Sequence, residues 1–86
     1  MYWTSTLPYV VTPKSGPMRQ LATLEDVRSA LLNDLPAERK KAPHWLEAGL
    51  LVVEASETGR AGDLRAAADA LVNALDAEGW MNRPAE

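Results

Sequence analysis

Strand-forming and helix-forming segments are separated along this chain, because the first 22 residues favour strands and the remainder favours helices. β-Branched and aromatic residues fill positions 9–12 (YVVT), an apolar stretch occupies positions 18–22, and positions 13–17 between them are rich in turn residues. This arrangement predicts a β-hairpin. Residues 2–6 (YWTST) have a similar strand propensity and could add a third strand. Strands followed by helices are typical of an α+β fold.

The first predicted helix begins after Thr23, whose hydroxyl can cap it, with Asp26 at the third position of a capping box. The aliphatic residues that follow are spaced by three and four positions and therefore share one face: Leu24, Val27, Leu31 and Leu35. Pro36 should end the helix, because proline cannot continue its hydrogen-bonding pattern. We expect a helix over about residues 24–35.

The second predicted helix covers residues 43–58. Pro43 suits its first turn, and Gly59 suits a left-handed cap after its last turn. Apolar residues cover nearly the whole circumference and leave Glu47 and Glu54 as a narrow polar stripe. A helix that is apolar on most sides is usually buried, so we expect this one to be the central element of the fold.

The third predicted helix covers about residues 63–78, with Asp63 as its cap and Gly79 at its end. Its core face is formed by Leu64, Ala68, Leu71 and Leu75. A second strip carries only small side chains, so another helix could approach it closely: Ala66, Ala70, Ala74 and Ala77.

A chain of 86 residues makes one domain, here residues 1–86. It contains no cysteine, which excludes disulfides, thiolate catalysis and cysteine-based zinc sites. No stretch approaches the ~20 apolar residues that a membrane span needs, and the first residues lack the pattern of a signal peptide. We therefore expect a cytoplasmic protein without a membrane partner.

The net charge of −3 is distributed unevenly. Residues 1–45 carry six basic and four acidic residues, whereas residues 46–86 carry three basic and eight acidic residues. Nucleic-acid binding usually needs basic residues gathered on one face, so the acidic C-terminal half argues against a nucleic-acid partner.

The packing pattern of the helices resembles a family of small alphaproteobacterial, rhizobial-type domains of unknown function (DUF982-like). The resemblance covers about three quarters of the chain and is carried by residues 23–36 (TLEDVRSALLNDLP), 48–55 (AGLLVVEA) and 64–80 (LRAAADALVNALDAEGW). It implies a fold of a short hairpin with three helices, and it implies no activity.

The segment 36–45 (PAERKKAPHW) gathers the only histidine with three basic residues. His44 is the one side chain with an ordinary titration near neutral pH, yet an isolated histidine in the first turn of a helix is usually an exposed surface residue. The basic residues Arg39, Lys40 and Lys41 could bind a partner protein or a phosphate, but such residues after a helix commonly complement its dipole. We interpret the segment as a connection between helices, with Trp45 reaching into the core.

No pattern in the sequence indicates a catalytic residue, a cofactor site or a metal site. One histidine without cysteines makes a poor metal-ligand set. Residues 59–63 (GRAGD) lack the preceding strand and the lysine of a phosphate-binding loop. The carboxylates with helical spacing on polar faces are typical of a solvated surface: Glu54, Asp69 and Asp76.

Three classes of function stay open. The first, which we favour, is a non-catalytic module that binds another protein. The second is an inhibitor encoded by a phage or mobile element, of the anti-CRISPR type, whose acidic face of Glu54, Asp69 and Asp76 would occupy a nucleic-acid site. The third is a small enzyme or ligand-binding domain with its aromatic residues around a pocket: Tyr2, Trp3 and Trp80.

We also expect a homodimer. An isolated hairpin leaves unpaired strand edges, here at Tyr9 and Val10, that invite a second chain. The alternative contact is the strip of small residues around Ala66 and Ala70.

Overall fold

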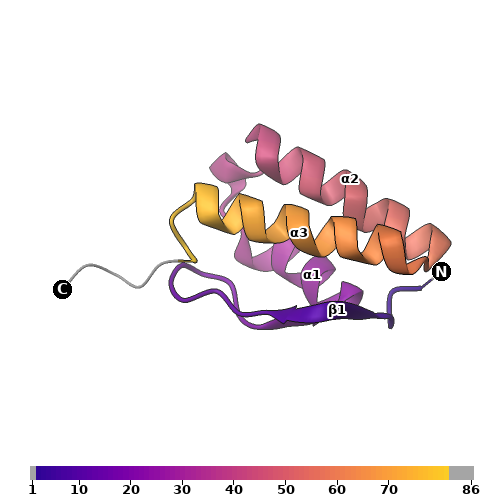
Figure 1. Cartoon of the computed structure of the whole chain (residues 1–86). Coiled ribbons are helices and arrows are strands. Elements are labelled where there is room, and N and C mark those ends of the chain that lie inside the picture. The colour runs from indigo at the N-terminus through magenta and orange to yellow at the C-terminus, as the bar shows by residue number, and fades with distance from the viewer. Residues whose placement is uncertain (1, 82–86) are drawn as a thin grey trace.

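The computed structural model describes residues 2–81, which form a two-stranded antiparallel sheet packed against helices (Figure 1). This arrangement confirms the predicted α+β class with an N-terminal hairpin and three helices. The elements in chain order are β1 (Thr6–Val11), β2 (Leu21–Thr23), α1 (Leu24–Ser29), the π-helix η1 (Ala30–Asp34), the 3-10 helix η2 (Ala37–Arg39), α2 (Pro43–Thr58) and α3 (Ala61–Ala77).

The hairpin pairs Thr6 with Thr23 and Val11 with Leu21, with an irregular register between them. Strand β1 begins three residues before the predicted start at position 9, and β2 begins three residues after the predicted start at position 18. The loop between the strands is longer than predicted as a result. Residues 2–5 form no strand. Instead, the Tyr2 backbone N–H donates to the Ser56 carbonyl, so the end of α2 satisfies a backbone group that a sheet would otherwise have paired.

The predicted capping box at the start of α1 is confirmed. The Asp26 N–H donates to the Thr23 hydroxyl at 3.1 Å, and the Asp26 carboxylate accepts from the backbone N–H groups of Thr23 and Ala22. These backbone hydrogen bonds lower the pKa of Asp26 from its ordinary value of 3.8. The helix ends where expected, but its last turn is a π-helix, closed by the hydrogen bond from the Leu35 N–H to the Ala30 carbonyl at 2.9 Å.

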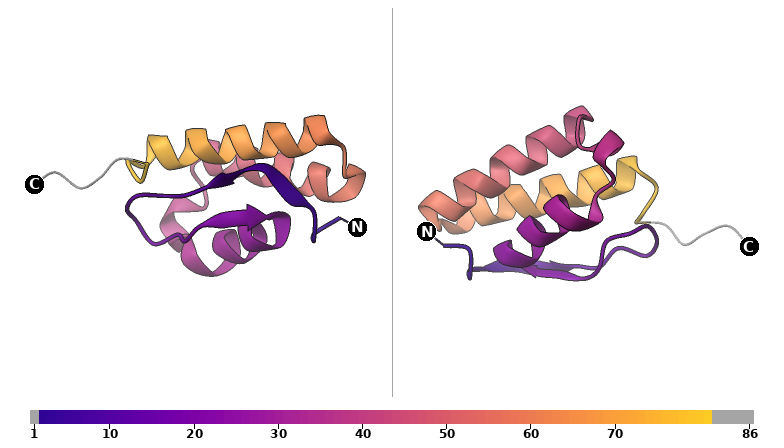
Figure 2. Two further views of the ribbon diagram at one scale, coloured as in Figure 1. Left: turned by 60° about the horizontal axis from the view of Figure 1, so that its bottom comes forward. Right: turned by 180° about the vertical axis from the view of Figure 1, so that it is seen from behind.

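Helices α2 and α3 lie side by side and are joined by a short turn (Figure 2). Helix α2 has the predicted bounds, and Gly59 has the expected left-handed conformation at φ 64°. Helix α3 begins at Ala61, two residues before the predicted start, so Asp63 is not its cap. The Asp63 carboxylate instead accepts a hydrogen bond from the Thr58 hydroxyl and ties the two helices together at the turn.

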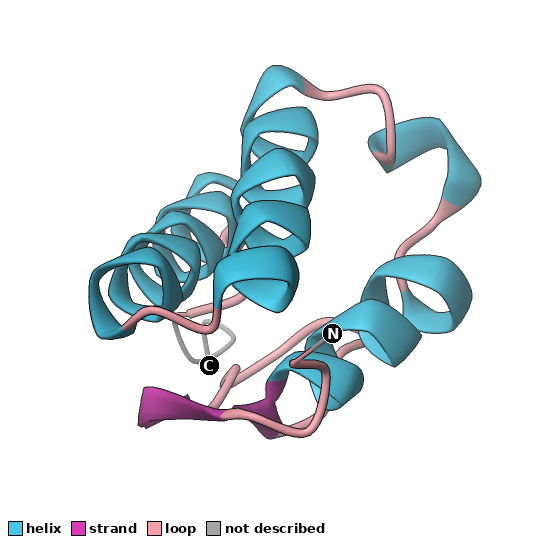
Figure 3. Ribbon diagram, turned by 90° about the vertical axis from the view of Figure 1, so that its right-hand side faces the viewer, coloured by secondary structure: helices cyan, strands magenta, loops and turns pink. Residues whose placement is uncertain are grey.

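The core lies between the sheet, α1 and the paired helices α2 and α3 (Figure 3). Strand β1 runs along α3, while α1 crosses behind (Figures 1 and 2). The largest fully buried apolar side chains come from all of these elements: Val11, Leu21, Leu24, Val27, Val52, Leu71 and Leu75. Within residues 2–81, no helix has the length and apolar character needed to cross a membrane.

Candidate functional site

Helix α2 exposes a large apolar face, which contradicts the prediction that it is buried on most sides. One side packs into the core through Trp45, Ala48, Val52 and Ala55. The opposite side carries three exposed residues at spacings of four and three: Leu46 at 56 %, Leu50 at 73 % and Val53 at 46 %. The prediction was wrong because a chain of this size has too few elements to surround one helix.

A groove of about 330 Å³ lies beside this exposed face, between α2 and the α1–η1 segment. Val52 and Val53 with Gly49 line it from α2, and Leu31 and Leu32 line it from η1. Leu32 is itself 63 % exposed. Trp3 and Arg28 complete the lining. We call this groove, together with the exposed side chains of Leu46 and Leu50, the α2 groove.

The charged residues around the α2 groove differ between its two sides. On the α1 side, the Arg28 guanidinium lies 5.3 Å from the centre of the Trp3 ring, within the range of a cation–π contact. On the α2 side, Glu47, Glu54 and Glu57 are exposed. Within residues 2–81 no ion pair engages any of these four charged side chains.

The π-helix η1 supplies Leu31 and Leu32 to the groove. Single π-helical turns are rare and occur often at functional sites, because they displace side chains from a regular helical position. No pattern of residues predicted this turn. Its position at the groove is an independent reason to regard the groove as functional.

Glu78, at the end of α3, is hydrogen-bonded to the segment 36–45, which we interpreted from the sequence as a connection between helices. Its Oε2 accepts hydrogen bonds from Arg39 Nε at 2.8 Å and Trp45 Nε1 at 2.9 Å, and lies 2.9 Å from His44 Nε2. Burial by itself would raise the pKa of Glu78, but the three hydrogen bonds outweigh it and lower the pKa to about 2. The carboxylate is thus ionised at neutral pH and accepts only, so His44 Nε2 carries a proton.

His44 is therefore part of a side-chain network and not the exposed residue that we expected. Its side chain is 27 % exposed, and that of Glu78 is 9 % exposed. Trp45 reaches the core as predicted. The sequence offered no signal for Glu78, which lies more than thirty positions away from each of its three donors.

The basic residues of this segment do not form a shared anion site. Arg39 is paired with Glu78 at 2.7 Å. Lys40 Nζ donates to the Leu32 carbonyl at 3.1 Å, in the last turn of η1, and so has the capping role that its position favoured. Lys41 is exposed.

The three carboxylates of the predicted acidic face have different surroundings. Asp69 accepts a hydrogen bond of 2.5 Å from the Tyr9 hydroxyl and thereby joins α3 to β1. Burial and this neighbouring carboxylate raise the pKa of Tyr9 to about 12. Asp76 lies two turns further along α3, whereas Glu54 belongs to the exposed side of α2. Asp69 is thus an intramolecular partner of β1.

The aromatic residues proposed around one pocket lie at separate places. Tyr2 packs at Gly59, before α3, where a Cβ would come within 2.8 Å of the Tyr2 ring. Trp80 follows α3, and its ring lies against Gly16 of the hairpin loop. The 17 residues of α3 span about 25 Å, so these two rings cannot share a small pocket. Trp3 lines the α2 groove.

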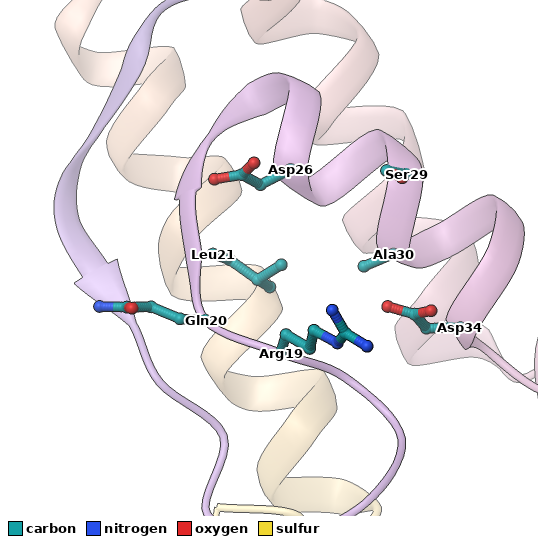
Figure 4. A pocket seen from close by; sticks show the side chains of 7 residues that line it. All are labelled: Arg19, Gln20, Leu21, Asp26, Ser29, Ala30 and Asp34. Atoms are coloured by element: carbon teal, nitrogen blue, oxygen red, sulfur yellow. The ribbon is translucent and has the colours of Figure 1, made fainter.

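A second hollow, of about 380 Å³, lies between β2 and α1–η1 and is mainly polar (Figure 4). Arg19 directs its guanidinium toward Asp34, while the Asp26 carboxylate points toward β2, where it accepts from the backbone N–H groups of Ala22 and Thr23. Arg19 is exposed, and Asp26 already serves the capping box. Nothing in this hollow selects a ligand. Within residues 2–81 no group of histidine, cysteine or carboxylate side chains is arranged to hold a metal ion.

The residues predicted for self-association differ in accessibility. Val10 is 51 % exposed on β1. Ala66 and Ala70 are half-buried, and Ala74 of the same strip is fully buried within the chain. The strip of small residues is therefore partly covered by the protein itself.

Comparisons with known proteins give no significant match to a family model, to a curated protein or to a solved structure. The resemblance to the alphaproteobacterial family stays a prediction. The function must therefore be inferred from the residues themselves.

Residues Leu46, Leu50 and Val53 are the functional candidates that sequence reasoning missed. The sequence did contain a signal for an exposed apolar side of α2. Apolar residues surround nearly the whole of this helix, and the other elements of an 86-residue chain are too few to cover it on every side. The uncovered side could not be named without the positions of α1 and α3.

Proposed function

We propose that this protein is a non-catalytic protein-interaction module and that it binds its partner through the α2 groove. The observation that supports this best is the concentration of exposed apolar side chains at one groove: Leu32, Leu46, Leu50 and Val53. Contiguous exposed apolar surface on a small domain commonly marks a binding site, whereas isolated exposed residues do not.

The size of this surface suits a reversible interaction. Complete burial of an aliphatic side chain contributes about 1.5–3 kcal/mol, so each of these partly exposed side chains would contribute about 1 kcal/mol when covered. Four of them would offset only part of the cost of association. Specific polar contacts at the edge of the groove must then add to the affinity.

We further propose that the protein works in the cytoplasm, which the lack of cysteine supports. A homodimer through β1 also stays a prediction. The strand has an exposed Val10, but Pro8 and the irregular register make its edge less suited to pairing. Light scattering over a dilution series, with Val10→Lys and Ala70→Glu as variants, measures this. A monomer at high concentration would rule it out.

The test of the module is a comparison of proteins that co-purify from the protein's own cells. We expect a partner that is retained by the wild type and is lost with the double variant Leu46→Ser/Leu50→Ser. Val10→Ser is the control, because it removes an aliphatic side chain that is 51 % exposed on another element. If no protein's recovery depends on Leu46 and Leu50, this function is wrong.

A further inference from the structure

We infer that the α2 groove binds an amphipathic helix of another protein, and that this helix carries basic residues along one flank of its apolar stripe. This inference rests on the proposed function and specifies the partner. It is carried by the shape of the groove and by the charges on its two sides.

The shape of the groove fits a helix. Its walls are themselves helical, with Leu31 and Leu32 on one side and Val53 on the other. Gly49 lies on the α2 wall, and a Cβ built there would meet no atom within 4 Å. The glycine therefore leaves open space at the surface and is not filling a tight internal contact. An apolar groove between two helices is a common receptor for the apolar face of a third.

The carboxylates of α2 indicate which residues the partner helix should carry on one flank. Glu47 and Glu54 are seven residues apart, so they lie on the same face of α2, next to Leu50 on the side away from Gly49. Glu57 lies in line with Leu50 and Val53, seven and four residues after them, and so stands at the end of the exposed apolar stripe. All three are exposed, and within the described part of the chain none has an ion-pair partner. A helix that fills the groove and also covers Leu50 would have Glu47 and Glu54 along its outer flank, where lysine or arginine would be favoured.

The opposite wall carries one positive charge. Arg28 is exposed, and apart from the Trp3 ring no described residue engages its guanidinium. An acidic residue on the partner's other flank could pair with it. We therefore expect the bound helix to carry basic residues on the flank near Glu47 and Glu54 and an acidic residue on the flank near Arg28.

The same charges argue against an antiparallel dimer of this chain through α2. A two-fold axis perpendicular to α2 would bring the exposed face of the helix against itself with the same flank on the same side. Glu47 and Glu54 of one copy would then lie beside the same carboxylates of the other, and like charges at an interface oppose binding. A basic partner helix meets no such repulsion.

Two synthetic helical peptides of 16 residues, the length of α2, test the inference. Both carry the same leucine stripe, and one flank of that stripe bears lysines in the first peptide and glutamates in the second. Fluorescence anisotropy at low salt measures their dissociation constants. We expect the lysine peptide to bind at least tenfold more tightly, and we expect this preference to shrink as salt screens the charges.

Variants of the protein locate the effect. The double variant Glu47→Lys/Glu54→Lys should lose or reverse the preference, while Leu50→Ser should weaken both peptides at least tenfold. Asn73→Ala, at an exposed position of α3 that does not line the groove, should change neither dissociation constant. In NMR spectra, the lysine peptide should shift the amide signals of Gly49 and Leu32.

Three results would overturn the inference: equal binding or a preference for the glutamate peptide, no binding of either peptide, and a homodimer that Leu50→Ser dissociates. The proposed function has a separate test. A cellular partner lost with Leu46→Ser/Leu50→Ser would preserve the module even if the peptides showed no charge preference. If no such partner were found, the proposed function as a protein-interaction module would be wrong even if the peptides bound.

Discussion

The indole Nε1 of Trp45 donates a hydrogen bond to Glu78 Oε2 at 2.9 Å and so joins the start of α2 to the end of α3. Trp45 also lies 5.9 Å from Trp80, ring centre to ring centre, and the Trp80 carbonyl accepts from the backbone N–H groups of Lys14 and Ser15. The hairpin loop, the α3 end and the α2 start therefore meet at one place. The α2 groove is formed by other residues, so this junction can be altered separately.

Replacement of Glu78 by alanine should destabilise the fold by about 1–3 kcal/mol, because it leaves the half-buried N–H groups of Trp45 and His44 without an acceptor. Urea unfolding measures the change. Glu57→Ala is the control, since Glu57 is exposed and should change the free energy of unfolding by less than about 0.5 kcal/mol. Equal effects of both substitutions would mean that the junction contributes nothing.

The stability of the fold should depend on pH through the ionisation of the Glu78 carboxylate. The pKa of Glu78 is about 2 in the folded protein and 4.5 ordinarily, so its stabilising contribution is complete above about pH 4.5 and is lost as the pH falls toward 2. Thermal unfolding between pH 6 and pH 2 measures this loss. Glu78→Ala should flatten the curve in that range, and a curve that stays as steep would contradict the assignment.

The Tyr9 phenol should ionise at a higher pH than an ordinary tyrosine. Its pKa of about 12 lies above the ordinary 10.0, so the phenol is kept neutral, and its contribution to stability is present below pH 10 and is lost as the pH rises through 12. A spectrophotometric titration should show one phenolate signal near pH 12. Tyr9→Phe should remove that signal, and Asp69→Asn should move it to lower pH. A late signal that survives in Tyr9→Phe would assign it to another group.

The neighbouring valines of α2 give a matched test of the exposed face. Val52 is 2 % exposed and Val53 is 46 % exposed. Val52→Ala should lower the free energy of unfolding by about 1–3 kcal/mol, because two buried methyl groups are lost, whereas Val53→Ala should change it by less than about 0.5 kcal/mol. Denaturant unfolding of both variants is sufficient. A larger loss from Val53→Ala would show that the face is covered.

Two glycines with similar backbone conformation should differ in their tolerance of alanine. Gly16 and Gly79 have φ values of 82° and 78°, so both substitutions introduce left-handed strain of about 1–2 kcal/mol. A Cβ at Gly16 would also lie 2.5 Å from the Trp80 ring, whereas a Cβ at Gly79 meets nothing within 4 Å. Gly16→Ala should therefore lower the thermal midpoint more than Gly79→Ala, and an equal shift would refute the packing of Trp80 on the loop.

Local features of this protein were readable from the sequence. The Thr23–Asp26 capping box, Pro43 at the start of α2 and Gly59 at its end lie where the residue types indicated. Each depends on a backbone angle or on a hydrogen bond between residues a few positions apart. Such interactions are determined by the segment itself, and so the helices and the fold class could be predicted.

Only the tertiary structure decided which side of α2 stays exposed and where Glu78 lies. The sequence of α2 is apolar nearly all round, so the exposed side of Leu46 and Leu50 depends on where α1 and α3 pack. Glu78 gains its role because chain folding brings Arg39, His44 and Trp45 to it from more than thirty residues away. Contacts between distant segments depend on the packing of whole elements, and the residue types within one segment do not specify them.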